Sequence, residues 1–272
     1  MRVFIIADIE GAVGIFNRRQ CYFLKPEFEH GRGCLTKDVN AVIEGVLEGG
    51  ADSVTVRDTH ETGQNIISEE LHPRAEYLGG QYAEPFPILG DPKGTDMVFM
   101  VASHAMSGNQ EGFFAHTFFG AFTEVRVNDT PVGEAFIYGA SLAEWNIPIG
   151  FNSGDVHAIN ESLRVMPWIK TVVVPKEEAF YTGSDAEQKI FTLREQLRAR
   201  ALEAVREQHT MRPMKQPPGP KWEVDIKTAE LAGKINKQGL ALAGNTLSWR
   251  SETYIDGFGT FFGLVHAAFA GL

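Results

Sequence analysis

The sequence predicts an α/β protein: a mostly parallel central sheet with flanking helices, followed by a smaller α+β part. Three short runs, each ended by polar residues, are typical of strands buried on both faces: residues 3–7, 53–57 and 96–102. A helical pattern separates the first two runs. Strand–helix–strand order implies parallel strands, whose carboxyl ends share one edge of the sheet.

The first strand ends on two carboxylates, Asp8 and Glu10, one residue apart. Side chains two residues apart on a strand point to the same side, so both should emerge together at the carboxyl end. Open α/β sheets bind ligands at that edge. Two carboxylates placed there repel each other unless a cation or a proton shares the site. The alternative is that Asp8 caps a helix and Glu10 is a solvated loop charge.

The next segment, residues 16–33, mixes aromatic and charged residues without a period, which favours a long ordered loop. A helix is expected from about Thr36, because apolar residues then recur on one helical face as far as Leu47. Thr36 suits its N-cap, and Gly49-Gly50 suits its end. The Pro- and Gly-rich region 71–93 predicts loops and short edge strands.

The second strand runs into Asp58-Thr59-His60, and the third runs into Ser103-His104. Three parallel strands therefore each end on potential metal ligands at the same edge of the sheet. Histidine is the commonest metal ligand, and two histidines with carboxylates suit zinc or a similar divalent ion. A glycine-bounded stretch, residues 108–120, then places His116 among phenylalanines, where the alternative is a histidine packed for shape.

The rest of the chain alternates strands and helices. After Gly133-Glu134 opens an apolar helix, the chain enters a second half that contains few chemical residues. We expect a catalytic metal-binding part, residues 1–160, and a smaller α+β part, residues 161–272, which either contributes to oligomerisation or completes a single domain. The expected strands are 124–127, 147–152, 171–174, 222–226 and 248–255, and the expected helices are 135–145, 185–208, 229–235 and 258–269.

Composition narrows the class of protein. The chain has 272 residues, 43% of them hydrophobic, and a net charge of −10, which argues against nucleic-acid binding. No run approaches the roughly 20 apolar residues of a membrane helix, so no membrane partner is expected. Cys21 and Cys34 are not in a CxxC pair, which argues against zinc ligation by cysteine; we expect reduced thiols in a cytoplasmic protein.

The candidate ligands exceed the needs of one metal ion. Three carboxylates (Asp8, Glu10 and Glu134) with two histidines (His60 and His104) are more than one tetrahedral zinc takes. Two ions that share a bridging carboxylate would use such a set, and Asp8 is the natural bridge. A dinuclear site can supply a nucleophilic hydroxide at neutral pH and polarise a carbonyl, which indicates hydrolysis of an amide or an ester.

These residues carry a family resemblance. Asp8-Ile-Glu10-Gly, Asp58-Thr-His60, His104, His116 in its glycine-bounded loop and the segment that ends at Gly133-Glu134 together resemble the DppA-type D-aminopeptidases, zinc metallopeptidases that remove N-terminal D-amino acids from short peptides. The resemblance implies that two zinc ions are held by Asp8, Glu10, His60, His104 and Glu134. It also implies that His116 is the catalytic residue, as nucleophile or base, and that the protein is a ring-shaped homodecamer.

The expected function is therefore hydrolysis of amide bonds in short peptides or aminoacyl amides by an aminopeptidase. The sequence departs from the family pattern at Ile6, where the family usually has Ser, after His60, where Glu61 begins a longer-side-chain stretch, and in a loop before His116 that is one residue longer. Two alternatives remain: a metal-dependent phosphohydrolase, which the histidines disfavour because Mg²⁺ prefers oxygen ligands, and a non-catalytic metal- or peptide-binding subunit.

Overall fold

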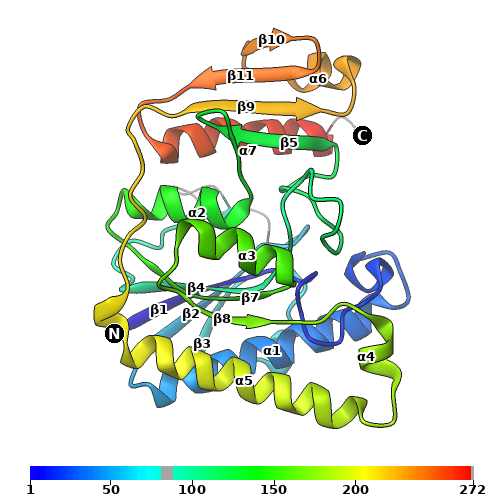
Figure 1. The fold of residues 1–272 in the computed structure, drawn as a ribbon, viewed down its shortest axis with the longest axis vertical. Helices are drawn as coiled ribbons and strands as arrows, with labels where there is room; N and C mark the ends of the chain where they lie inside the picture. The colour runs from blue at the N-terminus through cyan, green and yellow to red at the C-terminus, as the bar shows by residue number, and fades with distance from the viewer. Residues whose placement is uncertain (81–87, 271–272) are drawn as a thin grey trace.

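The computed structural model describes residues 1–80 and 88–270 and arranges them around two sheets (Figure 1). The larger sheet is entirely parallel and has the strand order β3-β2-β1-β4-β7-β8. Its strands are β1 (Arg2–Ala7), β2 (Ser53–Asp58), β3 (Ala75–Leu78), β4 (Met97–Ser103), β7 (Ile149–Gly154) and β8 (Lys170–Val173). The mixed α/β class with a parallel central sheet is confirmed.

The strand that carries the first carboxylates lies in the middle of this sheet. β1 pairs with β2 on one side, with Ala7 opposite Asp58, and with β4 on the other, with Ala7 opposite Val101. All residues of β4 are buried, and so are residues 3–7 of β1, as expected for strands covered on both faces. The carboxyl ends of the three strands predicted from the sequence therefore lie side by side.

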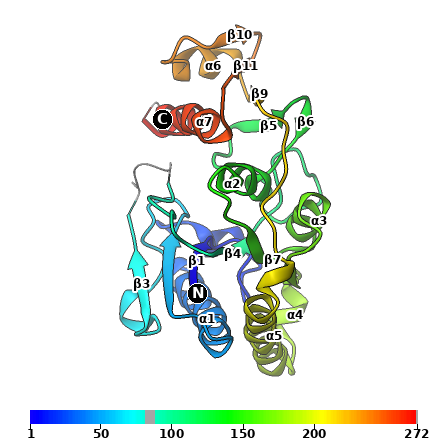
Figure 2. The same ribbon diagram turned by 90° about the vertical axis from the view of Figure 1, so that its left-hand side faces the viewer.

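Two long helices cover one face of the parallel sheet, α1 (Phe28–Glu48) and α5 (Ala186–Arg206), and they pack against each other (Figures 1 and 2). The expected loop over residues 16–33 is wrong in part, because α1 begins at Phe28 rather than near Thr36 and a short 3₁₀ helix, η1 (Arg18–Cys21), precedes it. The sequence did not predict this first part of α1, because the glycine at position 31 disfavours a helix. The glycine is required by packing, since a Cβ there would lie 2.0 Å from the carbonyl oxygen of Gln20.

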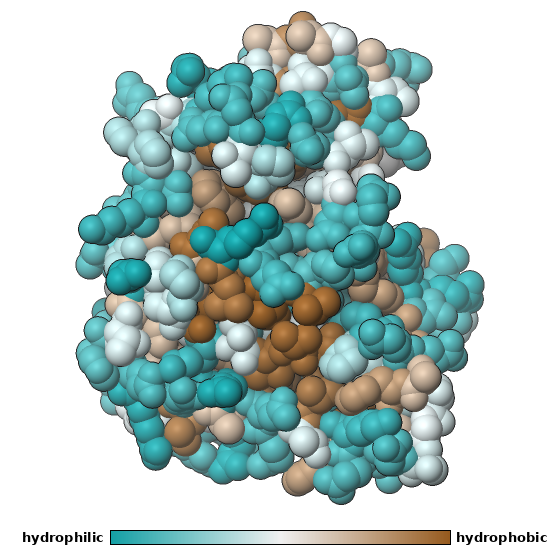
Figure 3. Space-filling model, in the orientation of Figure 1, coloured by the Kyte–Doolittle hydropathy of each residue, from teal (hydrophilic) through white to brown (hydrophobic). Residues whose placement is uncertain are grey.

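The opposite face is covered by α2 (Glu134–Ala143) and α3 (Val156–Val165) (Figure 1). The sequence did not predict α3, because its residues are largely polar. Asp155 caps this helix by accepting hydrogen bonds from the backbone of His157 and Ala158. Apolar side chains gather in the middle of the face drawn in Figure 3, over α3 and the strands beneath it.

Beyond α2 lies the second sheet, which is antiparallel and has the order β10-β11-β9-β5-β6. Its strands are β5 (Phe122–Val127), β6 (Thr130–Pro131), β9 (Lys221–Ile226), β10 (Ala241–Ala243) and β11 (Thr246–Arg250). The last helix, α7 (Tyr254–Ala270), packs between this sheet and α2 (Figure 1). The strand expected at 248–255 therefore ends earlier, at Arg250, and the helix begins at Tyr254.

The chain crosses between the two sheets. β5 and β6 come from the first half of the chain but belong to the antiparallel sheet. Conversely, β8 and α5 come from the second half, and they complete the parallel sheet and the helical layer on it. The expected boundary near residue 160 is thus not the division between the sheets. The remaining short elements are η2 (Ser68–Glu70), α4 (Glu178–Thr182), η3 (Gln208–Thr210) and α6 (Ala229–Ile235).

Within the Pro- and Gly-rich region, β3 is an edge strand as expected, and residues 81–87 lie outside the described residues. Among the helices of the described chain, none has the length and apolar character needed to cross a membrane.

Candidate metal centre

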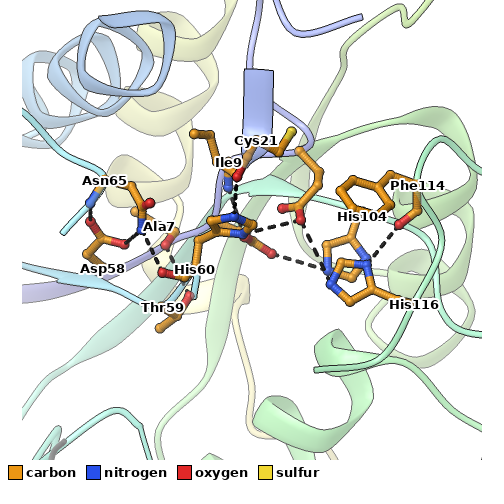
Figure 4. A network of polar contacts seen from close by, with 12 residues as sticks. Ala7, Ile9, Cys21, Asp58, Thr59, His60, Asn65, His104, Phe114 and His116 are labelled. Atoms are coloured by element: carbon orange, nitrogen blue, oxygen red, sulfur yellow. Dashed lines mark hydrogen bonds and ion pairs between the residues drawn. The ribbon is translucent and has the colours of Figure 1, made fainter. Parts of the chain in front are cut away.

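Six side chains converge at the carboxyl edge of the parallel sheet. Asp8 and Glu10 follow β1, His60 follows β2 and His104 follows β4, which is the convergence that the strand ends predicted. Two more arrive from outside the sheet. Glu134 is the first residue of α2, and His116 lies in the loop between β4 and β5. In Figure 4, His104 and His116 lie side by side and His60 lies opposite them.

Two of the groups of possible ligand atoms share Asp8, and a third joins Glu10, His104 and His116. In the first group, His60 Nδ1 lies 3.1 Å from Asp8 Oδ1 and 3.2 Å from Glu10 Oε1. In the second, His104 Nε2 lies 3.3 Å from Asp8 Oδ2 and 3.3 Å from Glu134 Oε1. Within each group the three ligand atoms lie within 4.8 Å of one another. Each group could therefore close around one divalent ion, with Asp8 offering one oxygen to each.

Glu10 provides an independent test of whether a cation fits. Its side chain is fully buried, and neither carboxylate oxygen makes a hydrogen bond. Apart from the imidazoles of His60 and His116, no cationic group is paired with it among the described residues, and buried carboxylates in native proteins are paired or coordinate metals. The donor set of carboxylate oxygens and imidazole nitrogens suits zinc.

The histidines are oriented by backbone carbonyls. His60 Nε2 donates to the carbonyl of Cys21 at 2.8 Å, and His104 Nδ1 donates to the carbonyl of Ala105 at 2.9 Å. Since a carbonyl only accepts, these bonds keep one proton on His60 Nε2 and on His104 Nδ1, so His60 Nδ1 and His104 Nε2 are the nitrogens that can lose a proton and bind a metal. Those are the two nitrogens that face the carboxylates, so each imidazole is arranged to act as a ligand.

The charges of this cluster shift its pKa values together. Burial alone would raise the pKa of Asp8, but hydrogen bonds from His104 and His60 outweigh it and hold that pKa well below its usual range. Burial would lower the pKa of His60 and of His104; the charges of Glu10 and Glu134 respectively, with hydrogen bonds to Asp8, raise both pKa values well above the ordinary one. Protons on these histidines thus offset the carboxylates, and a bound cation would displace them.

His116 touches the same cluster. Its Nδ1 donates to the carbonyl of Phe114 at 2.8 Å, and its Nε2 lies 3.8 Å from Glu10 Oε1. Burial lowers the pKa of His116, and the neighbouring charge of His104 lowers it further. The lowered pKa favours the neutral imidazole at pH 7, and its Nε2 lies on the side of Glu10.

The position of Asp58 after β2 suggested a metal ligand, but its carboxylate is instead hydrogen-bonded within the loop that follows. Its carboxylate accepts hydrogen bonds from the backbone of Asn65 and Ile66, at 2.6 and 2.9 Å, and from the Asn65 side chain at 2.8 Å. The same Asn65 amide donates to the carbonyl of His60 at 2.6 Å. The loop that carries His60 is thus held by Asn65, a residue that no spacing or periodicity in the sequence pointed to.

The loop that carries Glu10 is anchored from its other side. Asp38 of α1 accepts a hydrogen bond from the backbone of Val13 at 2.6 Å and one from Arg194 of α5 at 2.9 Å. Lys176 Nζ donates to the carbonyls of Ala12 and Ile15. Burial raises the pKa of Asp38 to about 6 in spite of the Arg194 charge.

Cys21 and Cys34 are buried free thiols.

A pocket of about 490 Å³ opens onto the cluster. It contacts both ligand groups and His116, and its walls come from the loop at Tyr22, from Glu61 and from the end of α7. A further cavity of about 160 Å³ reaches Asp8, His104 and Glu134 from the side of α2 and α3. The arrangement can bind a small substrate beside two cations and a neutral histidine.

Known proteins share this fold and sequence pattern. The sequence model of a family described as D-aminopeptidase matches residues 1–261. A D-aminopeptidase of Bacillus subtilis (strain 168) is 25% identical over 174 residues, which make up 64% of this chain and 63% of that protein, so the matched part is just under two thirds of the relative.

The fold is also that of a solved structure, the Zn-dependent D-aminopeptidase DppA from Bacillus subtilis, described as a self-compartmentalizing protease. The two structures superpose with a TM-score of 0.88 over 99% of this chain and 98% of that one, at 19% sequence identity. With the family match extending over nearly its whole length, the chain belongs to the D-aminopeptidase family.

Proposed function

We propose that the protein is a zinc-dependent aminopeptidase that hydrolyses the N-terminal amide bond of short peptides or aminoacyl amides. The observation that carries the proposal is the pair of ligand groups around Asp8, completed by a buried Glu10 carboxylate that has no hydrogen-bond donor. Family membership supports the same reaction class, and the Zn dependence of the structural relative supports the choice of metal.

Two zinc ions per subunit would use the whole set. Asp8, Glu10 and His60 would hold one, and Asp8, His104 and Glu134 would hold the other. When bound, the ions supply a water of lowered pKa and polarise the scissile carbonyl. His60 and His104 serve as ligands through the nitrogens that their backbone hydrogen bonds leave free.

His116 is the catalytic residue of this proposal. The residue lines the wide pocket, its Nε2 lies 3.8 Å from Glu10 Oε1, and its hydrogen bond to the Phe114 carbonyl fixes the ring. A neutral imidazole in this position can take a proton from the attacking group and return it to the leaving amine. Burial favours this neutral form by lowering the pKa of His116.

Assembly and location belong to the same proposal. The structural relative is described as self-compartmentalizing, which supports a homo-oligomer for this chain, and we propose a homodecamer in the cytoplasm whose 161–272 part contributes to the contacts between subunits. The mass of the purified protein by light scattering tests the proposal, since a monomer or a dimer would contradict it.

One preparation tests the function against its alternatives. We expect the purified protein to carry two zinc ions per subunit by elemental analysis and to hydrolyse aminoacyl amides, offered as both enantiomers, but not a phosphate ester. Chelation should abolish the activity, and zinc should restore it. Turnover of the phosphate ester instead would indicate the phosphohydrolase, and zinc binding without any turnover would indicate a binding subunit.

Ligand variants locate the site. Asp8→Ala should lose both zinc ions, because it belongs to both groups, whereas His60→Ala should lose one. Glu230→Ala, on the exposed side of α6, is the matched control and should retain both. Full zinc occupancy in Asp8→Ala would remove the metal centre from this edge of the sheet.

A further inference from the structure

The cavity of about 160 Å³ has no part in the function proposed so far. It lies between the parallel sheet and helices α2 and α3, and three of the six clustered residues line it: Asp8, His104 and Glu134. The larger pocket contacts the same three residues. The Asp8–His104–Glu134 group therefore stands between two spaces, one wide and one narrow.

Away from the ligand group, the walls of the narrow cavity are mostly apolar, although Glu161 and Arg164 also line it. Ile6 of β1 and Met100 of β4 come from the sheet, Val132 precedes α2, and all three are at most 4% exposed. Ala158 lies on the α3 side. Apolar walls of this kind bind apolar groups, and an engineered apolar cavity of about 150 Å³ takes up benzene.

The buried polar side chains around the cavity are already satisfied elsewhere. Ser103 donates to Asn152, Ser162 donates to the carbonyl of Ala158, and Thr59 donates to the carbonyl of Ala7. The Glu161 carboxylate likewise accepts from the Met106 backbone and from Asn109, so the part of the cavity away from the ligand group offers a polar occupant few partners.

Tyr138 is the exception. Its hydroxyl is buried near Thr59 and Glu134 but makes no hydrogen bond of normal geometry. An unpaired buried hydroxyl beside the ligand group is a place where a bound molecule can make a polar contact.

We propose that this cavity is the subsite for the side chain of the substrate's N-terminal residue, and that it selects an apolar side chain of up to about the size of a benzene ring. The inference rests on the proposed aminopeptidase function. An enzyme that removes one terminal residue needs a small space for that residue and an open way for the remainder. The volumes of about 160 and 490 Å³ on the two sides of the Asp8–His104–Glu134 group meet both needs.

Two substitutions change the size of the cavity in opposite directions. Met100→Ala enlarges it, and Ala158→Leu fills it. Met97→Ala is the matched control, because Met97 is an equally buried methionine of the same strand that packs on the other face of the sheet and does not line the cavity. It therefore reports the general cost of truncating a methionine in β4.

The experiment measures kcat/KM for the zinc-loaded proteins on glycine, alanine, norvaline, norleucine and phenylalanine amides. In the wild type, kcat/KM should rise by about tenfold per added methylene until the cavity is full. Met100→Ala should move the optimum to longer side chains and Ala158→Leu to shorter ones, whereas Met97→Ala should scale all substrates alike. Uniform scaling in all three variants would overturn the proposal.

A binding measurement separates this inference from the proposed function. Calorimetric titration with norleucine, the product of one of these reactions, should show binding to the wild type and at least a tenfold loss of affinity in Ala158→Leu. Equal affinity in both would overturn the subsite. If no amide is hydrolysed by the zinc-loaded wild type, the aminopeptidase proposal fails, and the titration still reports on the cavity.

Discussion

The imidazole rings of His104 and His116 stack face to face, with 3.9 Å between their centroids and 7° between their planes. Two stacked rings cannot both carry a positive charge without strong repulsion. Because burial, and then the charge of His104, lower the pKa of His116, the outer ring of the pair is the neutral one near pH 7. The stack therefore places a proton acceptor against a proposed metal ligand.

Replacing His116 should separate catalysis from metal binding. We expect His116→Ala to retain its zinc, because the other five side chains form both ligand groups, and to lose 10²- to 10⁴-fold in kcat, the usual contribution of a general base. Elemental analysis and amide hydrolysis measure the two effects. His209→Ala, on the exposed η3, is the control, and near-normal turnover by His116→Ala would contradict the assignment.

The pH dependence of the wild type follows from the same stack. Protonated His116 cannot accept a proton, and its pKa lies below the ordinary value of 6.5, so activity should persist as the pH falls from 7 through 6.5 and decline only below that. A profile of kcat/KM from pH 5 to 8 at saturating zinc tests this. An acidic limb centred above pH 6.5 would show that the histidine is not held neutral.

Glu10→Gln should destabilise the metal-free protein and also weaken its stabilisation by zinc. In the metal-free protein it removes the charge that pairs with the protonated His60 imidazole 3.2 Å away, so the free energy of unfolding should fall by about 1–3 kcal/mol. In zinc it removes a ligand, so the variant should gain less stability from the metal than the wild type does. Thermal unfolding with chelator and with zinc measures both, and Glu230→Gln controls for charge. Unchanged or higher stability with chelator would contradict the pairing of Glu10 with His60 in the metal-free protein.

Asn65→Ala should weaken zinc binding although Asn65 belongs to neither ligand group. Its amide joins Asp58 to the carbonyl of His60, so its loss frees the loop that positions this imidazole. Groups that orient metal ligands are typically worth 10- to 100-fold in affinity. Competition with a zinc-binding dye measures the change; Asn160→Ala, on the exposed side of α3, should leave the affinity as it is.

The buried Asp38 predicts a stability difference that varies with pH. Its folded pKa of about 6 lies above the ordinary 3.8, so the folded state binds the extra proton and the contribution to stability is fully present below about pH 4. That contribution is lost as the pH rises to about 6. The unfolding free energy of the wild type relative to Asp38→Asn should therefore fall by about 3 kcal/mol between pH 4 and 6 and then stay level. Urea unfolding in chelator measures it, and a difference that grows over this range would contradict the prediction.

The sequence alone indicated most of the residues at the carboxyl edge of the parallel sheet, because a buried strand and the polar residues that end it form a recognisable local pattern. The buried runs of β1, β2 and β4 end on Asp8, His60 and His104, and parallel pairing brings these ends together whatever the rest of the chain does. The alternation of strand and helix likewise carried the fold class. These inferences depend on local patterns, which survive folding unchanged.

What local patterns could not supply depends on contacts between distant segments. His116 and Glu134 reach the cluster from outside the sheet, so no strand end indicated where they would lie, although both were candidates by residue type. Asn65 acts through a backbone carbonyl, for which the sequence has no signature. The start of α1 at Phe28 and all of α3 were missed because glycines and polar residues there are tolerated by close packing against other elements.

The excursion of the chain into the antiparallel sheet has a mechanical consequence. The chain leaves the cluster at His116, forms the β5–β6 hairpin and returns at Glu134. Both ends of this segment therefore lie beside His104. Within the antiparallel sheet β9 pairs with β5 of this hairpin, and α7, which lines the wide pocket, packs against the sheet. A cation bound by both Asp8 and Glu134 would link the parallel sheet to the start of α2, where the chain returns from the antiparallel sheet. The shape of the substrate entrance would then depend on whether the metal is bound.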